Sequence, residues 1–292
     1  MTIRHYQIFA AVCGEMNMTA AAGHLNMTQP AVSQTIAELE EYYGVRLFER
    51  LSRKLYLTGA GEKLLGYARH ILRMNADAEG EMRTLNRSAA LRLGVSVTVG
   101  TYVLPGLAAA YREKAPWVTL RVTEDNTAQI EKMIMEDRLD LGFVEGEVTL
   151  RDIVTRPFRE DGMTLICGRD HPFAKRKSVE PRELEGENFI LREEGSGTRK
   201  SFEDVMREHA LRWSSTWTCN NADTIKMAVA RGLGISVISR LAVQKELDAG
   251  ELAGVDIEGL RFTRLFQFIY HKDKYHTEAM RDFMDFCCGV CG

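Results

Sequence analysis

The sequence predicts an α/β protein in which a small helical module precedes two lobes of alternating strands and helices. Three observations support this fold class. Residues 1 to 58 carry apolar side chains at helical spacing and end in a short alternating segment. A proline-free stretch follows, to about residue 86. From residue 92 onward, strand-like and helix-like runs take turns, which favours a mostly parallel sheet covered by helices.

Length and composition are those of a globular protein with two domains. Of the 292 residues, 45% are apolar and 27% are charged, and the formal net charge is -3. No run approaches the roughly 18 apolar residues that a membrane-spanning helix needs. The first residues also lack the apolar core of a signal peptide. We therefore expect a cytoplasmic protein without a membrane partner.

The six cysteines do not indicate a metal site. Three of them lie near the end of the chain, at Cys287, Cys288 and Cys291. A structural zinc needs four ligands, and no second cysteine pair or histidine cluster is available to complete them. A loose tail or buried thiols is the better interpretation, and we expect neither a metal nor another cofactor.

A helix-turn-helix is predicted within residues 1 to 58. The first helix has one apolar face, formed by Phe9, Val12, Cys13 and Met16. A second helix at about 19 to 25 is rich in alanine, and Thr28 can cap a third helix with Pro30 in its first turn. The apolar residues of the third helix lie in one narrow arc and are Val32, Ile36, Leu39 and Tyr43. Two helices joined by a tight turn, with small residues where they cross, form this motif.

The segment 46 to 58 alternates enough to form a two-stranded wing with a basic tip. Amide and hydroxyl side chains at the start of the third helix suit base edges, and the basic tip suits phosphate. A packing module with a solvated face is the alternative. The charges of the module cancel, since Arg4, Arg46, Arg50, Arg53 and Lys54 stand against Glu15, Glu38, Glu40, Glu41 and Glu49. One copy should therefore bind DNA weakly, and dimerisation would strengthen binding.

Residues 59 to 88 are predicted to form a linker and dimerisation helix. Its apolar side chains recur near helical spacing, at Leu64, Leu65, Ala68, Ile71, Leu72, Met82 and Leu85. A helix of roughly 28 residues is about 42 Å long, which is too long to bury its apolar stripe on the preceding module. Pairing with a second copy would bury the stripe, and a simple spacer is the alternative.

Residues 89 to 292 are predicted to form a two-lobed domain. We expect the first lobe at about 92 to 162 and 267 to 292, and the second at about 163 to 266. The predicted strands lie near 93 to 97, 118 to 123, 139 to 144, 163 to 167, 189 to 191, 215 to 219, 235 to 238 and 266 to 270. The predicted helices lie near 104 to 114, 127 to 136, 201 to 211, 223 to 230, 241 to 248 and 277 to 286. Two lobes in tandem suggest a cleft between them.

Four polar turns are candidates for binding a ligand in that cleft. Ligands of open α/β sheets lie beyond the carboxyl ends of strands, where helix N-termini favour anions. The candidate residues of these turns and of the strand end beside them are Thr98, Gly100, Thr101, Asn126, Glu145, Ser196, Gly197, Thr198, Arg199 and Asn221. The turn 195 to 199 is the strongest, because two glycines permit close backbone approach and Arg199 adds charge. An ordinary capped helix is the alternative for each turn.

Signatures of an enzyme are missing. The turn 195 to 200 fits neither a nucleotide P-loop nor a dinucleotide fingerprint, and it lacks the spacing of a hydrolase nucleophile. The seven histidines are dispersed. A binding module is therefore favoured over an enzyme that uses the glycine loop.

The sequence resembles the LysR-type transcriptional regulators. Their helix-turn-helix pattern is matched in register by Ala21-Ala22, Leu25, the run 28 to 33 (Thr-Gln-Pro-Ala-Val-Ser), Ile36 and Leu39-Glu40. The match continues through Gly44-Val45, Leu47-Phe48, Arg50, Leu57-Thr58 and Ala60-Gly61. The resemblance covers the whole chain, because the two lobes correspond to the effector domain of the family, a fold similar to type 2 periplasmic binding proteins.

The resemblance implies a DNA-binding surface. Its residues would be Thr28, Gln29, Pro30, Ser33, Gln34, Arg50, Arg53 and Lys54. Gln29, Ser33 and Gln34 would face bases, Arg53 would reach the minor groove or backbone, and the other polar residues would contact phosphates. Ala37 stands where the family often has a basic residue. The implied partners are double-stranded promoter DNA, further copies of the chain in a homodimer or homotetramer, and RNA polymerase.

The resemblance also implies an effector bound between the lobes. Several stretches, including 140 to 146 and 191 to 199, look most similar to the branch that regulates sulfur assimilation. The effector would then be a small sulfur oxyanion held by Thr98, Ser196 and Thr198 with Asn126 nearby. Arg199 would either bind the anion or pair with Glu145 or Asp223. A cytoplasmic solute-binding protein or a metabolite sensor without a DNA role is the alternative function.

Overall fold

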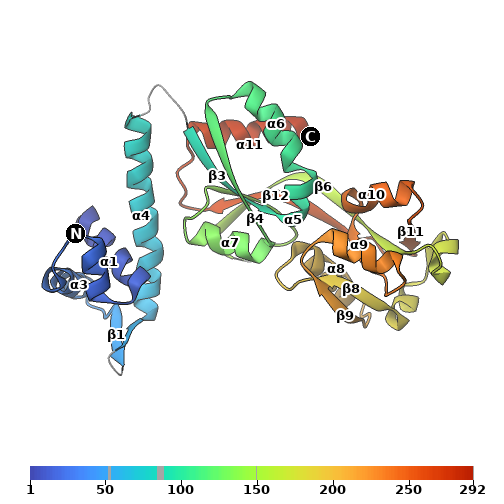
Figure 1. Cartoon of the computed structure of the whole chain (residues 1–292), viewed down its shortest axis with the longest axis horizontal. Helices are drawn as coiled ribbons and strands as arrows, with labels where there is room; N and C mark the ends of the chain where they lie inside the picture. Colours follow the sequence, from blue (N-terminus) through green and yellow to red (C-terminus); the bar gives the residue numbers. More distant parts are fainter. Residues whose placement is uncertain (52–53, 84–88, 149, 292) are drawn as a thin grey trace. The chain divides into compact units, whose positions relative to one another are not determined.

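The computed structural model describes residues 1–51, 54–83, 89–148 and 150–291 (Figure 1). The chain divides into two compact units. One comprises Met1–Arg87 with Met135–Asp137, and the other comprises Ser88–Ile134 with Arg138–Gly292. Each unit has a core of its own. Among the helices of the described segments, none is long and apolar enough to cross a membrane.

The first unit is a winged helix-turn-helix followed by a long helix, as the sequence predicts. Its elements are α1 (Ile3–Glu15), α2 (Met18–His24), α3 (Gln29–Tyr43), β1 (Phe48–Leu51), β2 (Lys54–Leu57) and α4 (Gly59–Arg83). Asn17 caps α2 by accepting from the amides of Thr19 and Ala20. Thr28 occupies the N-cap position of α3 with Pro30 in the first turn, and Gly44 ends the helix in the left-handed conformation.

The three helices share one apolar core. The buried residues that fill it are Ile8, Phe9 and Val12 of α1, Ala21 and Ala22 of α2, and Val32, Ile36 and Leu39 of α3. The two alanines leave room for the crossing of α2 and α3, because a larger side chain would separate the helices. The predicted apolar faces of α1 and α3 extend too far toward the C-terminal ends of these helices. Met16 has a left-handed backbone and is 36% exposed, and Tyr43 is 39% exposed.

The wing is fixed to the helices by the carboxylate of Glu40. Oε1 of Glu40 accepts hydrogen bonds from the amides of Leu47 and Phe48, at 2.8 and 3.2 Å. The hydroxyl of Thr58 donates to the carbonyl of Arg46 at 2.7 Å and accepts from the amide of Gly61 at 3.0 Å. The Glu40 contacts tie β1 to α3, and the Thr58 contacts tie the base of the wing to α4.

The 25 residues of α4 make a helix about 38 Å long. Leu64 and Leu65 pack against the helix-turn-helix core. Farther along, Met74 and Met82 are 45% and 67% exposed. The predicted stripe also included Leu85, which lies outside the described residues. Pairing of α4 with a second copy stays a prediction.

The second unit is the predicted two-lobed α/β domain. Its strands are β3 (Ala89–Ser96), β4 (Val118–Asp125), β5 (Leu141–Glu145), β6 (Ile153–Gly168), β7 (Ser178–Val179), β8 (Asn188–Arg192), β9 (Ser214–Cys219), β10 (Ser236–Ser239), β11 (Leu252–Ile257) and β12 (Thr263–His271). Its α-helices are α5 (Val97–Tyr102), α6 (Leu104–Lys114), α7 (Thr127–Met135), α8 (Gly197–Glu208), α9 (Ala222–Ala230), α10 (Arg240–Asp248) and α11 (Glu278–Cys291). Two 3-10 turns, η1 (Pro172–Lys175) and η2 (Pro181–Gly186), lie between β6 and β8.

One sheet runs through both lobes. Its strand order is β4-β3-β5-β12-β6-β11-β7, and β10 also pairs with β6. Strands β3, β4 and β5 are parallel, whereas β12 returns between β5 and β6 and is antiparallel to both. The prediction of a mostly parallel sheet is therefore wrong for the centre of the domain. Because β6 and β12 each pass from one lobe to the other, the predicted lobe boundaries stay a prediction.

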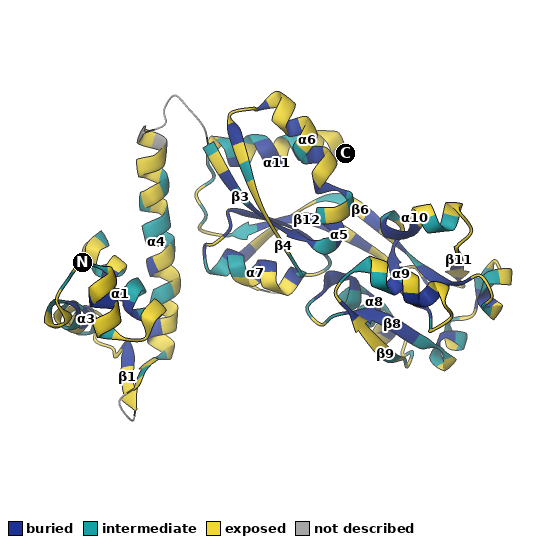
Figure 2. Ribbon diagram, in the orientation of Figure 1, coloured by how far each residue is buried: buried dark blue, intermediate teal, exposed yellow. Residues whose placement is uncertain are grey.

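The first lobe buries an aromatic core between the sheet and two helices. In Figure 1, α6 and α11 lie together over one face of β3 and β12, and α7 lies over the other face. Phe143, Phe268 and Phe283 meet edge to face or tilted in this core, and Tyr111 packs on Phe283. Cys287 of α11 is buried here as well. Strand β3 is largely buried, while β4 at the edge is largely exposed (Figure 2).

The second lobe has two smaller cores on either side of its strands. One contains Phe189 and Phe202, and the other contains Ile190 and Val229. The sequence missed β11, because Gly254 interrupts its apolar pattern and lowers the strand propensity. It also extended the first strand to Val97, which instead begins α5 behind the N-cap residue Ser96.

A buried carboxylate ties the middle of β3 to the segment after β12. Asp140 accepts from the amide and the guanidinium of Arg92 and pairs with Nζ of Lys274 at 2.9 Å. Burial alone would raise the pKa of Asp140, but the hydrogen bonds and charges of Arg92 and Lys274 outweigh it and lower the pKa to about 2. Asp140 is therefore charged at neutral pH and holds this part of the first lobe together.

Candidate functional sites

The start of α3 presents polar side chains that the fold does not use. The hydroxyl of Thr28 makes no capping hydrogen bond. Gln29 and Pro30 are exposed, and Ser33 is half-buried one turn later. Gln34 is exposed and donates to Glu38 at 3.1 Å. Because amides and hydroxyls at a helix start can reach base edges in the major groove, this surface has the composition of a reading helix.

The wing adds cations at the end of the same module. Arg50 and Lys54 are exposed, and the nearest polar contact of Arg50 is Sδ of Met18 at 3.8 Å. Arg53, the third predicted basic residue of the wing, lies outside the described residues. The two cations that are described can contact phosphate without breaking an ion pair that the module needs.

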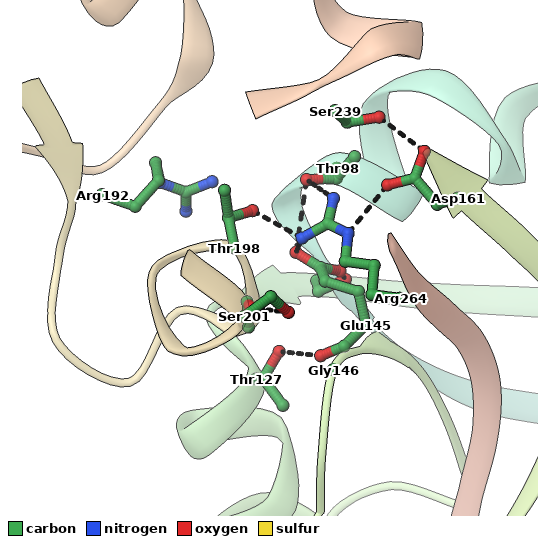
Figure 3. A network of polar contacts seen from close by, with 12 residues as sticks. Thr98, Thr127, Glu145, Gly146, Asp161, Arg192, Thr198, Ser201, Ser239 and Arg264 are labelled. Carbon is green, nitrogen blue, oxygen red and sulfur yellow. Dashed lines mark hydrogen bonds and ion pairs between the residues drawn. The ribbon is translucent and has the colours of Figure 1, made fainter. Parts of the chain in front are cut away.

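In the second unit, the guanidinium of Arg264 lies at the junction of the two lobes (Figure 3). Its Nε donates to Oδ2 of Asp161 at 2.7 Å, across the β6–β12 ladder. Nη1 donates to Oγ1 of Thr198 at the start of α8, also at 2.7 Å, and Nη2 donates to Oγ1 of Thr98 on α5 at 3.4 Å. The side chain of Arg264 is 1% exposed. One buried cation thus contacts elements of both lobes.

Glu145 is the second carboxylate beside this guanidinium. One of its carboxylate oxygens lies 3.5 Å from Nη1 of Arg264 and accepts from Thr98 at 3.2 Å. The other oxygen accepts from the hydroxyl of Ser96. The main-chain carbonyl of Glu145 accepts from the hydroxyl of Thr127 at 3.3 Å. Three hydroxyl groups and a guanidinium therefore hold one residue at the end of β5.

The network carries more negative than positive charge. Asp161 receives a second hydrogen bond from Ser239 at 2.7 Å, so both of its oxygens are satisfied. Asp161 and Glu145 are 1% and 2% exposed, and one guanidinium faces the two carboxylates. The nearby guanidinium of Arg192 is matched by Glu193, with contacts of 2.8 and 2.9 Å. Formally, the two carboxylates leave the site around Arg264 with one net negative charge.

The start of α8 closes against the end of β5. A Cβ at Gly197 would overlap the main-chain carbonyl of Glu145, so only glycine allows this approach. Gly195 has φ +85, and its carbonyl accepts from the amide of Ala128 at 3.1 Å. Ser196 is the N-cap residue, yet its buried hydroxyl caps no amide and has no hydrogen-bond partner within the described structure.

A second contact joins the lobes beside α9. Tyr102 of α5 packs on the core that contains Ile225 and Val243. Burial raises the pKa of Tyr102. Lys226 lies in the same region and pairs with Glu246 at 2.7 Å and with Asp223 at 3.0 Å. This contact is made by apolar packing and ion pairs, and it leaves the start of α8 as the more polar side of the junction.

The structure brings together some of the predicted effector residues. Thr98, Glu145, Gly197 and Thr198 meet at Arg264, and Ser196 is adjacent to them. Asn126 lies beside Gly195 but accepts from the amide of Gln129 at 3.1 Å, as a local turn does.

Other predicted residues have local roles. Arg199 donates to Glu203 at 2.7 Å and lies over the ring of Trp213, so the predicted pairing with Glu145 or Asp223 is wrong. Asn221 caps α9 by accepting from the amide of Thr224 at 2.8 Å. Gly100 packs against the carboxylate of Glu124, and its neighbour Thr101 is exposed. These two residues therefore lie on α5 rather than in a turn.

The sequence interpretation missed Arg264 and Asp161. A signal for Arg264 exists, because it stands two and four residues before Phe266 and Phe268 and so shares their buried face of the strand. A charged residue on the apolar face of a strand needs a partner. Asp161 has no such signal, since it follows Arg159 and Glu160 in a polar stretch. Within the residues that the structure describes, no group of His, Cys, Asp or Glu side chains is arranged to hold a metal ion.

Two family models match the chain. One, described as "Bacterial regulatory helix-turn-helix protein, lysR family", matches residues 3–62. The other, described as "LysR substrate binding domain", matches residues 86–291. The chain belongs to the LysR family. It is thus a DNA-binding transcriptional regulator with a domain for a small-molecule effector, in a family of regulators and not of enzymes.

Relatives and solved structures agree with this membership. The transcriptional regulator CbbR of Rhodospirillum rubrum is 36% identical over 294 residues, which span 99% of this chain and 97% of that protein. The regulatory domain of CcmR from Synechocystis, solved in complex with 2-PG, is 28% identical with a TM-score of 0.65 and covers 69% of this chain and 97% of that one. A full-length OxyR variant from Pseudomonas aeruginosa has the same fold, with a TM-score of 0.74, 22% identity and coverage of 100% of this chain and 96% of that one.

Replacing Arg264 by leucine tests whether this network supports the LysR effector domain. Arg264→Leu leaves Asp161 and Glu145 buried without their cation, which costs about 3–5 kcal/mol of stability. We expect a large fall in the unfolding temperature of the domain. The control is Arg156→Leu, because Arg156 pairs with Asp285 at 3.4 Å on the surface, where a pair contributes under about 1 kcal/mol. Equal effects of the two substitutions in thermal unfolding would contradict a supporting role for Arg264.

Proposed function

We propose that this LysR regulator is controlled by a small oxyanion that binds at the lobe junction, next to Arg264 and the start of α8. The buried hydroxyl of Ser196 carries the proposal. A buried hydroxyl without a partner is costly, and a bound ligand would supply the missing acceptor. Ser196 also stands at the N-terminus of a 12-residue helix, where the helix dipole favours negative charge.

The donors around Ser196 suit an oxyanion. Arg264 can give two Nη groups, which form short, charge-assisted hydrogen bonds with anionic oxygens. Thr98 and Thr198 approach from different lobes and could each donate a hydroxyl proton. An anion held by both lobes would favour one lobe arrangement over others and so shift the population of regulator states.

Sulfite is the first candidate for the effector. The resemblance of stretches 140 to 146 and 191 to 199 to sulfur-responsive regulators is the reason for testing it before other anions. A related regulatory domain, that of CcmR, binds 2-PG. Sulfate and phosphate complete a set of small oxyanions that differ in charge and shape, and they separate a sulfite response from a general anion response.

We also propose roles for the DNA-binding residues. Gln29, Ser33 and Gln34 contact base edges, while Thr28, Arg50 and Lys54 contact phosphates. The helix-turn-helix segment has no net charge, so a single copy lacks the basic surface of a typical duplex binder. Paired copies, joined through α4 in a dimer or tetramer, compensate by binding two half-sites at once. RNA polymerase is then a further partner at the promoter.

Thermal unfolding of the full chain tests the effector proposal. Sulfite at about one hundred times its Kd should raise the unfolding temperature by roughly 5 to 10 °C. The shift should be lost in Ser196→Ala and Thr198→Val, which remove one hydroxyl each. Thr123→Val, an exposed change on β4, is the control and should keep the shift. Absence of any shift with sulfite, sulfate and phosphate would rule out the anion effector and leave the regulator itself unaffected.

Gel-shift assays with DNA from upstream of the gene and with unrelated DNA test the DNA contacts. Gln29→Ala should lose about 1 to 3 kcal/mol of binding to the specific site, with little change on unrelated DNA. Arg50→Ala should weaken binding to both DNAs and reduce the salt dependence. Gln7→Ala, an exposed change on α1, serves as the control. If Gln29→Ala weakened both complexes equally, Gln29 would not be a base-reading residue.

A further inference from the structure

We propose that the carboxylate of Glu145 is a resident substitute for the effector, and that an anionic effector binds by displacing it. This inference rests on the proposed function. The carboxylate of Glu145 would compete with the anion for the same donors, and this competition would set how tightly the anion binds. Glu145 is the acidic residue of the junction that we propose to leave, because it is the last residue of β5.

The carboxylate already occupies two of the donors that the proposed anion needs, Thr98 and Nη1 of Arg264. Its two oxygens accept from Ser96 and from Thr98, and one of them also faces Nη1 of Arg264. The contacts resemble those of a small oxyanion held by two hydroxyls and a guanidinium (Figure 3). Among the hydroxyls at this junction, that of Ser196 is left without a partner in the described structure.

The negative charges at the junction prevent the carboxylate of Glu145 and the effector anion from occupying it together. Asp161 and Glu145 already present two negative charges to a single guanidinium in a buried site. A third negative charge would leave the repulsion between anions uncompensated, and in a medium of low polarity this repulsion is strong at distances of a few ångströms. The anion can therefore bind only when one of the two carboxylates leaves.

Glu145 is better placed to leave than Asp161. Asp161 lies within β6, opposite Arg264 in the ladder, and accepts from Nε of Arg264 at 2.7 Å, whereas the oxygen of Glu145 lies 3.5 Å from Nη1. Glu145 is followed by Gly146, whose φ of +85 marks the end of the strand. The main chain here is held separately, since Thr127 donates to the carbonyl of Glu145 and Gln267 donates to the carbonyl of Gly146 at 2.6 Å. The side chain can thus swing out while the backbone keeps its place.

The exchange would also favour ligands of a particular kind. The displaced group is a carboxylate of one charge with two acceptor oxygens, so the best replacement is a compact anion that presents oxygens to Arg264 and reaches Ser196 and Thr198. Arg264 keeps its Nε on Asp161 throughout, which leaves only the Nη groups for the ligand. A bulky anion would lose these contacts at the tight approach of Gly197 to Glu145.

Binding of sulfite to full-length Glu145→Gln, measured by titration calorimetry, tests the inference. Glutamine keeps the size of the side chain and one acceptor oxygen, replaces the other oxygen by a donor NH2 group and removes the charge. Removing one unit charge a few ångströms from the bound anion should tighten binding at least about tenfold. The matched control is Glu203→Gln, because Glu203 pairs with Arg199 on α8 and should leave the affinity unchanged. Sulfate and phosphate serve as further probes under the same conditions.

The outcomes separate this inference from the proposed function. Binding at least about tenfold tighter for Glu145→Gln than for the wild type and Glu203→Gln supports it. Equal or weaker binding by Glu145→Gln, with clear binding by the wild type, overturns the inference and leaves the anion effector standing. Absence of binding of all three anions to every variant overturns both. Should Glu145→Gln not fold, Glu145→Asp, whose shorter side chain withdraws the carboxylate, must show the same direction of change.

Discussion

The guanidinium of Arg264 is the interaction on which the effector domain depends. A buried cation must keep its acceptors, because an unpaired charge in the interior costs several kcal/mol. Its acceptors come from β6, β5, α5 and the start of α8, so the cation fixes how these elements meet. The glycine at position 197 makes the meeting possible, since any side chain there would separate α8 from β5. The packing of these elements, the charge balance of the site and the junction of the lobes therefore depend on the side chain of Arg264.

In the proposed function, the same constraint explains how binding at the junction would regulate. Two carboxylates share one guanidinium, and one of them ends a strand. A ligand that takes the place of the Glu145 carboxylate gains its own contacts while those of the carboxylate are lost. The net affinity of the ligand therefore depends on the difference between these two sets of contacts. Such an exchange would give a regulator that does not respond to anions that bind too weakly to displace the carboxylate. It would respond once an anion that binds tightly enough accumulates. The helix-turn-helix module, which carries no net charge, would then act through paired copies.

The local parts of this architecture are predictable from the sequence. The run 28 to 33 predicts the start of α3, and α6 has the bounds that its apolar spacing predicts. The turn 195 to 199 lies at the junction, as its glycines and hydroxyls indicate. Arg264 was missed because its partners Asp161 and Thr98 are 103 and 166 residues away in the sequence. Only the insertion of β12 between β5 and β6 brings them together, and a mostly parallel sheet does not predict that insertion.

A crystal structure of the full chain grown with sulfite measures the exchange at the junction most directly. We expect sulfite oxygens within hydrogen-bond distance of Nη1 of Arg264 and the hydroxyl of Thr198, with the side chain of Glu145 turned away from Ser96. Sulfite bound there while Glu145 keeps its contacts with Ser96 and Arg264 would contradict the exchange. A junction without sulfite, in crystals grown well above the concentration that shifts the unfolding temperature, would contradict the site itself.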